Sequence, residues 1–240
     1  MGGERVTGGR VGAAVDIGIW LATLAGLLGA VTWLSLHVPR TGLLMQIGAP
    51  AEMAVLFVVS TLLLRRRGEG WRSVGLTAPP PGARVAGLVV GGYLAIVALN
   101  AVCVLVLFPA LGLAMPSFGA FGALKGHPGV FAYWLLAAWT SAALGEELQF
   151  RGFLRSRLER LFGSGRGAVA GAIVGQAVLF GLGHIYQGWA GVLVTGMVGL
   201  VLGVLFLAAR RNLVPGMVLH ALVDTVGLTA LFLGFAPPAP

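Results

Sequence analysis

Charge is scarce in this sequence. Only 10% of its 240 residues are charged and only eight residues are acidic, whereas about 25% of the residues of a soluble domain are charged. This scarcity excludes an ordinary water-soluble domain. Hydrophobic residues make up 58% of the chain and the mean hydropathy is +0.93, so the sequence predicts a polytopic membrane protein.

Cysteine is almost absent as well. Cys103 is the only one, which excludes an intrachain disulfide and a cysteine-based metal cluster. Lysine is nearly replaced by arginine, and no run interleaves basic with aromatic residues. Despite the net charge of +8, we therefore expect no nucleic-acid partner. The first apolar run is too long for a signal peptide and lacks a convincing cleavage site, so we interpret it as a membrane helix.

Long apolar runs are what the sequence does have. A helix needs about 20 apolar residues to cross a bilayer, and seven runs approach that length. They predict an all-α, polytopic transmembrane helical bundle of about seven spans. The runs lie near residues 13–36, 43–64, 85–108, 130–150, 167–185, 189–209 and 214–235.

The arginines predict the orientation of the bundle. With a cytoplasmic N-terminus and seven spans, fourteen arginines fall on the cytoplasmic side, and only Arg40 and Lys125 fall outside. The bias towards Ala, Gly, Val and Arg favours a bacterial source. We therefore expect an integral protein of a bacterial plasma membrane with its N-terminus in the cytoplasm.

Few strongly polar side chains remain inside the predicted spans. A charge in a bilayer is costly and marks a candidate functional residue. Asp16 and Glu52 lie near span ends, where they could snorkel or cap a helix. The others lie on the fourth, fifth and seventh spans: Glu146, Glu147, Arg151, His184, His220 and Asp224.

These polar residues form one stripe on each of three helices. Residues four apart share a helix face, and this spacing joins Glu147 to Arg151 and His220 to Asp224. Phe180 and His184 have the same spacing, and Gln176 extends their row. Lipid cannot satisfy such stripes, so they face one another or a wet cavity. The alternative is that they lock helices together, with hydrogen bonds worth about 0.6 kcal/mol each.

A helical hairpin would bring two of the stripes to one depth. Residues 151–162 carry apolar side chains at helical spacing, and Gly163-Ser164-Gly165 follows as a turn. Glu146 lies 18 residues before Ser164 and His184 lies 20 after it. At about 1.5 Å per residue, both lie roughly 27–30 Å from the turn. A helix that bends along the membrane surface instead would lose this match.

At these residues the sequence resembles the CPBP family (CAAX proteases and bacteriocin-processing, or Abi, proteins), which includes the Rce1-type prenyl-protein endopeptidases. The family pattern EExxxR, FxxxH and HxxxN or HxxxD is matched in order. It reads Glu146-Glu147-x-x-x-Arg151, Phe180-x-x-x-His184 and His220-x-x-x-Asp224. The resemblance covers residues 140–227, and it divides the chain into N-terminal transmembrane helices with a cytoplasmic loop (1–128) and a catalytic core (129–240).

The resemblance implies an intramembrane endopeptidase with a buried polar active-site cavity and a membrane-associated protein or peptide substrate. Glu146 would activate the attacking water as a general base, and His184 would orient that water. His220 would stabilise the oxyanion, and Arg151 would hold Glu147. The alternative is a non-catalytic immunity or scaffold protein of the same fold. A proton-coupled transporter is disfavoured, because there is no inverted repeat or broken helix pair.

Asp224 leaves the cofactor open. An ionised Asp cannot donate to an oxyanion as the family's Asn can, so Asp224 is protonated, orients His220 or binds a metal. His184, His220 and Asp224 are the ligands if the enzyme is metal-dependent, with Zn²⁺ as the candidate. The metalloprotease signature HExxH and the rhomboid-like GxSxG are absent. No cofactor is certain from the sequence, and no oligomeric state is predicted.

Overall fold

The predicted all-helical architecture is confirmed in the part of the chain that the structure describes. The computed structural model describes residues 3–37 and 42–235, and every regular element in these ranges is helical. We call each continuous helical segment a rod. Five rods are single helices: α1 (Gly3–His37), α2 (Gly42–Arg65), α7 (Arg166–Leu182), α8 (Gly188–Ala208) and α9 (Val214–Leu233). Two rods are composite: α3 (Gly82–Val102) continues into η2 (Cys103–Leu107) and α4 (Phe108–Leu111), and α5 (Pro128–Ala137) continues into η4 (Ala138–Leu154) and α6 (Arg155–Phe162). Short 3₁₀ turns η1 (Trp71–Val74), η3 (Gly119–Leu124) and η5 (Ile185–Gln187) lie in the connections.

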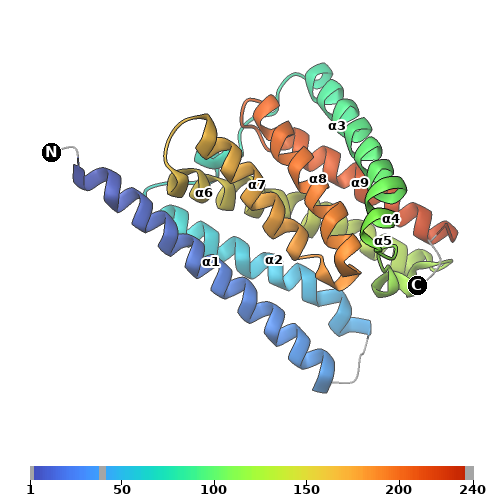
Figure 1. The fold of residues 1–240 in the computed structure, drawn as a ribbon. Helices are drawn as coiled ribbons and strands as arrows, with labels where there is room; N and C mark the ends of the chain where they lie inside the picture. The colour runs from blue at the N-terminus through green and yellow to red at the C-terminus, as the bar shows by residue number, and fades with distance from the viewer. Residues whose placement is uncertain (1–2, 38–41, 236–240) are drawn as a thin grey trace.

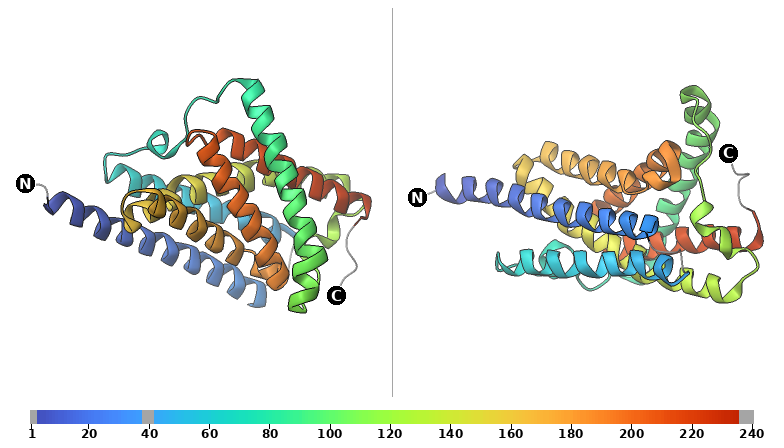
Figure 2. Two further views of the ribbon diagram at one scale, coloured as in Figure 1. Left: turned by 45° about the horizontal axis from the view of Figure 1, so that its top comes forward. Right: turned by 90° about the horizontal axis from the view of Figure 1, so that it is seen from below.

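The seven rods correspond to the seven predicted runs. α1 and α2 lie side by side, α7 and α8 form a second pair, and α3 packs against α8 and α9 (Figures 1 and 2). The η4 segment occupies the centre and packs against α2, α7, α8 and α9. Residues far apart in the sequence therefore meet along one helical segment.

Not every rod is apolar enough to be a membrane span by composition. Four described segments are long and apolar enough: Gly9–Leu34, Gly82–Leu111, Ile185–Ala208 and Val214–Leu233. The apolar helix over Arg166–Leu182 is shorter. The rod containing η4 carries Glu146, Glu147 and Arg151, which lower its hydropathy. Seven helices fit the predicted bundle, and four satisfy the composition of a membrane-spanning helix.

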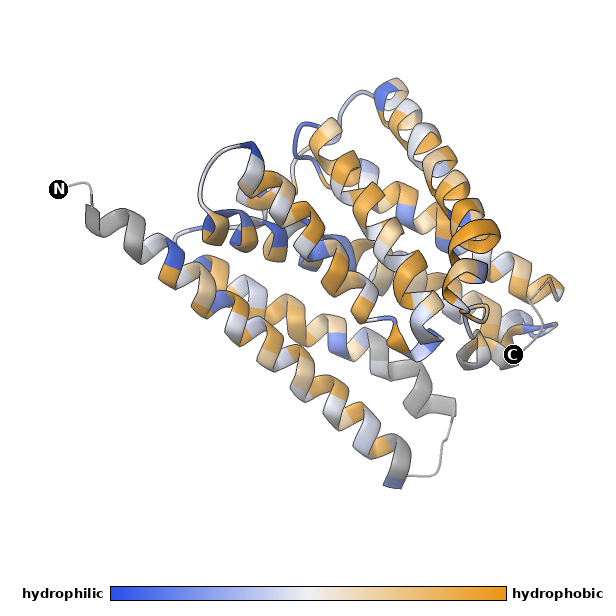
Figure 3. Ribbon diagram, viewed as in Figure 1, coloured by the Kyte–Doolittle hydropathy of each residue, from blue (hydrophilic) through white to orange (hydrophobic). Residues whose placement is uncertain are grey.

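Hydrophilic residues gather at one end of the bundle. Figure 3 shows them on α6 and on the loops around it, while the long helices are largely hydrophobic. The N-terminal part of α1, the α2–α3 connection, the α6–α7 turn and the α8–α9 connection all lie at this end (Figure 1). We call it the arginine-rich end. The helices group the predicted cytoplasmic arginines, although a cytoplasmic location of this end stays a prediction.

The predicted amphipathic extension and hairpin turn are confirmed. α6 continues from η4 to Phe162, and α7 begins at Arg166 and packs back against α6. Gly163 and Gly165 adopt φ values of +108° and +93°, a conformation that side-chain-bearing residues rarely adopt. The two glycines therefore allow the reversal within three residues.

Asp16 neither snorkels nor caps a helix. Its side chain is fully buried, and its carboxylate contacts three arginines: Arg66 at 3.1 Å, Arg67 at 2.5 Å and Arg157 at 2.9 Å. Arg157 also binds Glu69, at 2.9 Å. An unpaired buried charge costs several kcal/mol, so this network fastens α1, α2 and α6 to one another at the arginine-rich end.

The η4 segment is a π-helix rather than the α-helix that the sequence pattern predicts. Its backbone is wider, with hydrogen bonds from residue i to i+5, a geometry often found at functional sites. Side-chain anchors hold it in place: Gln149 is fully buried and accepts hydrogen bonds from Trp20 (2.9 Å) and Ser60 (2.6 Å). These partners come from α1 and α2, so the periodicity of the segment alone could not reveal them.

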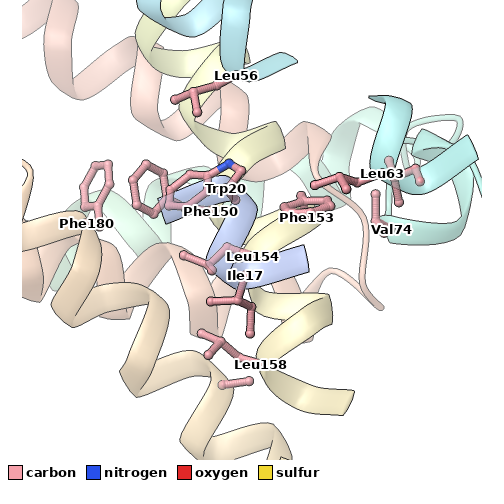
Figure 4. Close-up of a cluster of buried hydrophobic side chains, with 12 residues drawn as sticks. Ile17, Trp20, Leu56, Leu63, Val74, Phe150, Phe153, Leu154, Leu158 and Phe180 are labelled. Carbon is pink, nitrogen blue, oxygen red and sulfur yellow. The ribbon is translucent and has the colours of Figure 1, made fainter. Parts of the chain in front are cut away.

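A hydrophobic cluster surrounds the anchored segment. Trp20 packs edge-on against Phe150, and Phe150 packs edge-on against Phe180, with ring centroids 5.5 and 5.1 Å apart. Figure 4 shows these rings in one layer, with Phe153 and Leu154 nearby. The cluster joins α1, η4 and α7 beside the candidate site.

Small residues let α7 and α8 approach closely. A Cβ on Gly181 would lie 2.5 Å from the Val192 carbonyl oxygen and 3.0 Å from the Gly196 Cα. Gln176, which is fully buried, donates a hydrogen bond to the Gly199 carbonyl (2.9 Å). Close backbone approach and interhelical hydrogen bonds are the main means of helix association in lipid.

Candidate active site

Glu147 is held between two cationic or donor side chains. Its Oε1 lies 3.0 Å from Arg151 Nη1 and 3.1 Å from His220 Nδ1. Glu147 and Arg151 are buried, at 1% and 0% side-chain exposure. The predicted pairing of Glu147 with Arg151 is thus present, and His220 is a second partner that the sequence did not assign.

Arg151 is also fixed by an aromatic ring. Its guanidinium lies over the Phe180 ring, 4.2 Å from the centroid. Such cation–π contacts contribute about 2 kcal/mol when desolvated. The guanidinium forms an ion pair with Glu147 rather than a well-aligned hydrogen bond, so the ring compensates for donors that lack hydrogen-bond partners among the described residues.

Glu146 faces the other side of His220. Its Oε2 lies 3.7 Å from His220 Nε2, and Asp224 Oδ2 lies 3.7 Å from the same nitrogen. These separations are longer than hydrogen bonds but short enough for ion pairs. Glu146 is 20% exposed and Asp224 is 29% exposed, and Glu146 Oε2 makes no hydrogen bond to the described residues. Glu146 is therefore the less constrained of the two glutamates.

The hydrogen-bond partners define how His220 carries its protons. A carboxylate oxygen only accepts, so the contact with Glu147 requires a proton on Nδ1. Nε2 then faces two carboxyl groups, Glu146 and Asp224, which favour a proton there as well. This arrangement presents His220 as a donor with a fixed orientation.

His184 joins the cluster through Phe180. Its Nδ1 lies 2.9 Å from the Phe180 carbonyl oxygen, which only accepts, so Nδ1 carries the proton and Nε2 of the neutral ring offers a lone pair. The Phe180 ring lies 5.0 Å from the His184 ring and 6.0 Å from the His220 ring. Asp224 also interacts electrostatically with His184. The hairpin thus brings His184 to the same cluster as the acids of η4 and α9.

Several residues of the site were not assigned a role from the sequence. Phe180 was only part of a motif, yet it contacts Arg151 and both histidines. A Cβ on Gly216 would lie 2.8 Å from Glu147 Oε2, so this glycine makes room for the carboxylate. Only tertiary packing identifies these roles.

Two more polar side chains approach Glu146. Glu52, which the sequence placed at a helix end, interacts electrostatically with Glu146. Tyr186 interacts in the same way with Glu146 and Asp224, and its ring lies 5.8 Å from that of His184. The acid at position 52 was visible in the sequence as a costly charge, whereas nothing singled out Tyr186.

The arrangement of the His, Cys, Asp and Glu side chains bears on whether the site holds a metal. No group of three or more His, Cys, Asp or Glu side chains among residues 3–37 and 42–235 is arranged to hold a metal ion. His220 Nδ1 is engaged with Glu147, and His184 Nδ1 with a backbone carbonyl. A metal-bound histidine commonly donates its other ring N–H to a carbonyl or carboxylate, so these Nδ1 contacts do not oppose metal binding. The assignment of His184, His220 and Asp224 as metal ligands stays a prediction.

The expected polar cavity stays a prediction. Two hollows of the described structure lie elsewhere: one between α7 and α8, the other around Gly112–Ser117 and Gln187–Ala190. Neither is lined by any of the six candidate residues. Helix packing nevertheless brings these residues together.

A comparison with models of known protein families finds a match to the segment that carries the candidate site. The model of the family described as "Type II CAAX prenyl endopeptidase Rce1-like" matches residues 128–226, which include all six candidate residues. The predicted resemblance to the CAAX proteases is thus confirmed over this segment, which is less than half of the chain. No curated protein and no solved structure matches the chain.

Proposed function

We propose that this protein is an intramembrane endopeptidase in which Glu146 activates a water molecule to hydrolyse a peptide bond of a membrane-associated substrate. The observation that carries the proposal is that the two glutamates differ in their hydrogen-bond and ion-pair partners. Glu147 is bound by Arg151 and His220, whereas Glu146 has an oxygen without a hydrogen-bond partner among the described residues. A general base needs such an oxygen to receive a proton.

The reaction follows from the protons that each group carries. Glu146 accepts a proton from water while the water oxygen attacks the scissile carbonyl carbon, and His184 Nε2 accepts the second water hydrogen bond. The protonated Nε2 of His220 donates to the carbonyl oxygen as it becomes an oxyanion. Glu146 then gives its proton to the leaving nitrogen as the C–N bond breaks.

The remaining charged groups position His220 and balance its charge. Glu147 holds Nδ1 of His220, and Arg151 offsets the Glu147 charge. Asp224 lies 3.7 Å from His220 Nε2 and keeps that nitrogen protonated before substrate arrives. The role is that of a positioning acid and needs no protonated Asp224.

The test compares purified wild type with Glu146→Gln, Glu146→Ala and His184→Ala on a panel of membrane peptides, farnesylated CAAX peptides included. We expect both Glu146 variants to lose at least a thousandfold in kcat, because the base is removed, and to unfold at the wild-type temperature in detergent.

Glu69→Gln is the control, since Glu69 lies at the arginine-rich end, and it should keep wild-type kcat. Wild-type cleavage by a folded Glu146→Ala protein would refute the proposal. If no peptide is cleaved while Glu146→Gln keeps the cellular phenotype, the non-catalytic scaffold is favoured instead.

A further inference from the structure

A groove with a volume of about 730 Å³ lies between α7 and α8. Its apolar wall consists of Val169, Ile173, Val174, Leu200, Val204 and Leu207. Val174 and Val204 are 52% and 54% exposed. In a membrane protein, an open apolar groove of this kind contacts lipid tails.

The groove has a charged rim at the arginine-rich end. Arg166, Arg211 and Glu159 of α6 line it there. Arg211 binds both oxygens of Glu159, at 3.0 and 2.8 Å, and Arg155 binds the same carboxylate at 2.5 Å. The single acid is thus more than neutralised, while the Arg166 side chain forms no ion pair or hydrogen bond with the described residues.

Backbone features add positive potential to the same rim. α7 begins at Arg166, so the free N–H groups of its first turn point out of the helix at this end. Arg210 and Arg211 both adopt left-handed conformations, with φ of 58° and 62°, which non-glycine residues rarely adopt. The turn is held by hydrogen bonds from Arg211 N to the Phe206 carbonyl (2.8 Å) and from Leu213 N to the Gly75 carbonyl (3.0 Å), and it keeps Arg211 at the groove.

We propose that this groove is a binding site for one anionic phospholipid. The phosphate lies between Arg166 and Arg211, and an acyl chain follows the apolar wall between α7 and α8. The charge complementarity selects an anionic headgroup, and the adjoining apolar wall selects a lipid over a free anion. Anionic lipids are enriched in the cytoplasmic leaflet, the side predicted for this end of the bundle.

The test measures lipid retention by the purified full-length protein with native mass spectrometry, using phosphatidylglycerol and phosphatidylcholine of identical chains. Wild type should retain phosphatidylglycerol in preference to phosphatidylcholine. Arg166→Gln should lower that preference about fivefold, the effect of one basic residue near an anionic membrane surface. Val204→Trp fills the groove without changing its charge and should lower retention of both lipids.

Matched control variants distinguish lipid retention by the groove from a general effect of net charge or of a larger surface side chain. Arg72→Gln removes an exposed arginine at the same end, and Val97→Trp enlarges an exposed valine on α3. Both should behave as wild type. The proposal is overturned if wild type retains the two lipids equally, if Arg72→Gln acts like Arg166→Gln, or if Val204→Trp retains lipid normally. Displacement of phosphatidylglycerol by excess inorganic phosphate would indicate a free-anion site instead. None of these outcomes depends on peptidase activity.

Discussion

Glu146 and Glu147 are chain neighbours with different surroundings at the residue scale. Glu147 is buried and contacts Arg151 and His220, while Glu146 is partly exposed and lies 3.7 Å from His220 Nε2. In a medium that solvates charge poorly, a paired carboxylate is fixed and a less constrained one is reactive. One residue step along η4 therefore separates a structural acid from the proposed base.

A prediction at this scale concerns the Glu147–Arg151 pair. Arg151→Met removes the cation and leaves Glu147 buried beside His220 alone, so we expect a loss of about 3–5 kcal/mol in the free energy of unfolding. Adding Glu147→Gln should recover part of that loss. Denaturant unfolding in detergent micelles measures both. Additive losses in the double variant would contradict coupling between the two side chains.

At the scale of elements, the central segment η4 owes its position to partners on both sides. Trp20 and Ser60 bind Gln149 on one face, and His220 binds Glu147 on another. The helix α9 reaches this close because Gly216 has no side chain. The approach of α9 to η4 therefore sets the geometry of the acid cluster.

Gly216→Ala tests this approach. A Cβ would lie 2.8 Å from Glu147 Oε2, so the carboxylate or the helix must shift, and overpacking of this kind costs about 1–3 kcal/mol. We expect kcat on the cleaved peptide to fall at least tenfold. Gly227→Ala on the same helix is the matched control, because no atom lies within 4 Å of its added Cβ. Equal activities of the two variants would show that the close contact is unimportant.

A second element-scale prediction concerns pH. Burial raises the pKa of Glu69, but hydrogen bonds and charges from Arg160 and Arg157 outweigh it, and the net pKa lies below its usual value. A depressed folded-state pKa stabilises the fold above the unfolded pKa, and this stability is lost as the pH falls through the folded value. The unfolding temperature should therefore decline on acidification below about pH 4.5.

Glu69→Gln serves as the comparison for that decline. The variant lacks the titrating group, so its unfolding temperature should be lower than that of wild type near pH 6 and should change less on acidification. Thermal unfolding in detergent at several pH values measures the difference. Parallel curves for the two proteins would contradict a stabilising role for the Glu69 carboxylate.

At the scale of the whole molecule, the charged residues lie in two regions, the interior of the bundle and its arginine-rich end. The candidate site lies within the bundle, and the remaining arginine networks lie at one end. Asp16, Glu69 and Glu159 bind arginines there, so three of the eight acidic residues offset cations at that end. The charge distribution still leaves an excess of arginines, which is the basis of the predicted orientation.

Labelling of single cysteines tests that orientation. In a Cys103→Ser background, Ser164→Cys at the α6–α7 turn should react with a membrane-impermeant maleimide only after permeabilisation. Lys125→Cys at the opposite end should react in intact cells. Both positions are exposed, so access depends on the membrane rather than on burial. The opposite pattern would place the arginine-rich end outside.

The periodicity of the chain was sufficient to predict much of this architecture. Seven apolar runs, the amphipathic extension and the Gly163–Gly165 turn all follow from local rules. The π-helical backbone of η4 does not, because its anchors Trp20 and Ser60 are 129 and 89 residues away from Gln149. Local patterns cannot carry information about such distant partners.

The sequence by itself determined that the protein is helical and membrane-embedded, and it singled out the polar residues that are candidates for function. Charge is so costly in lipid that Glu146, Glu147 and Arg151 stand out without a structure. Only the tertiary structure decided which partners each of these side chains has. Which glutamate is hydrogen-bonded and which is less constrained depends on His220 Nδ1 facing Glu147 and on Phe180 lying beneath Arg151. These contacts arise only when η4, α7 and α9 pack together.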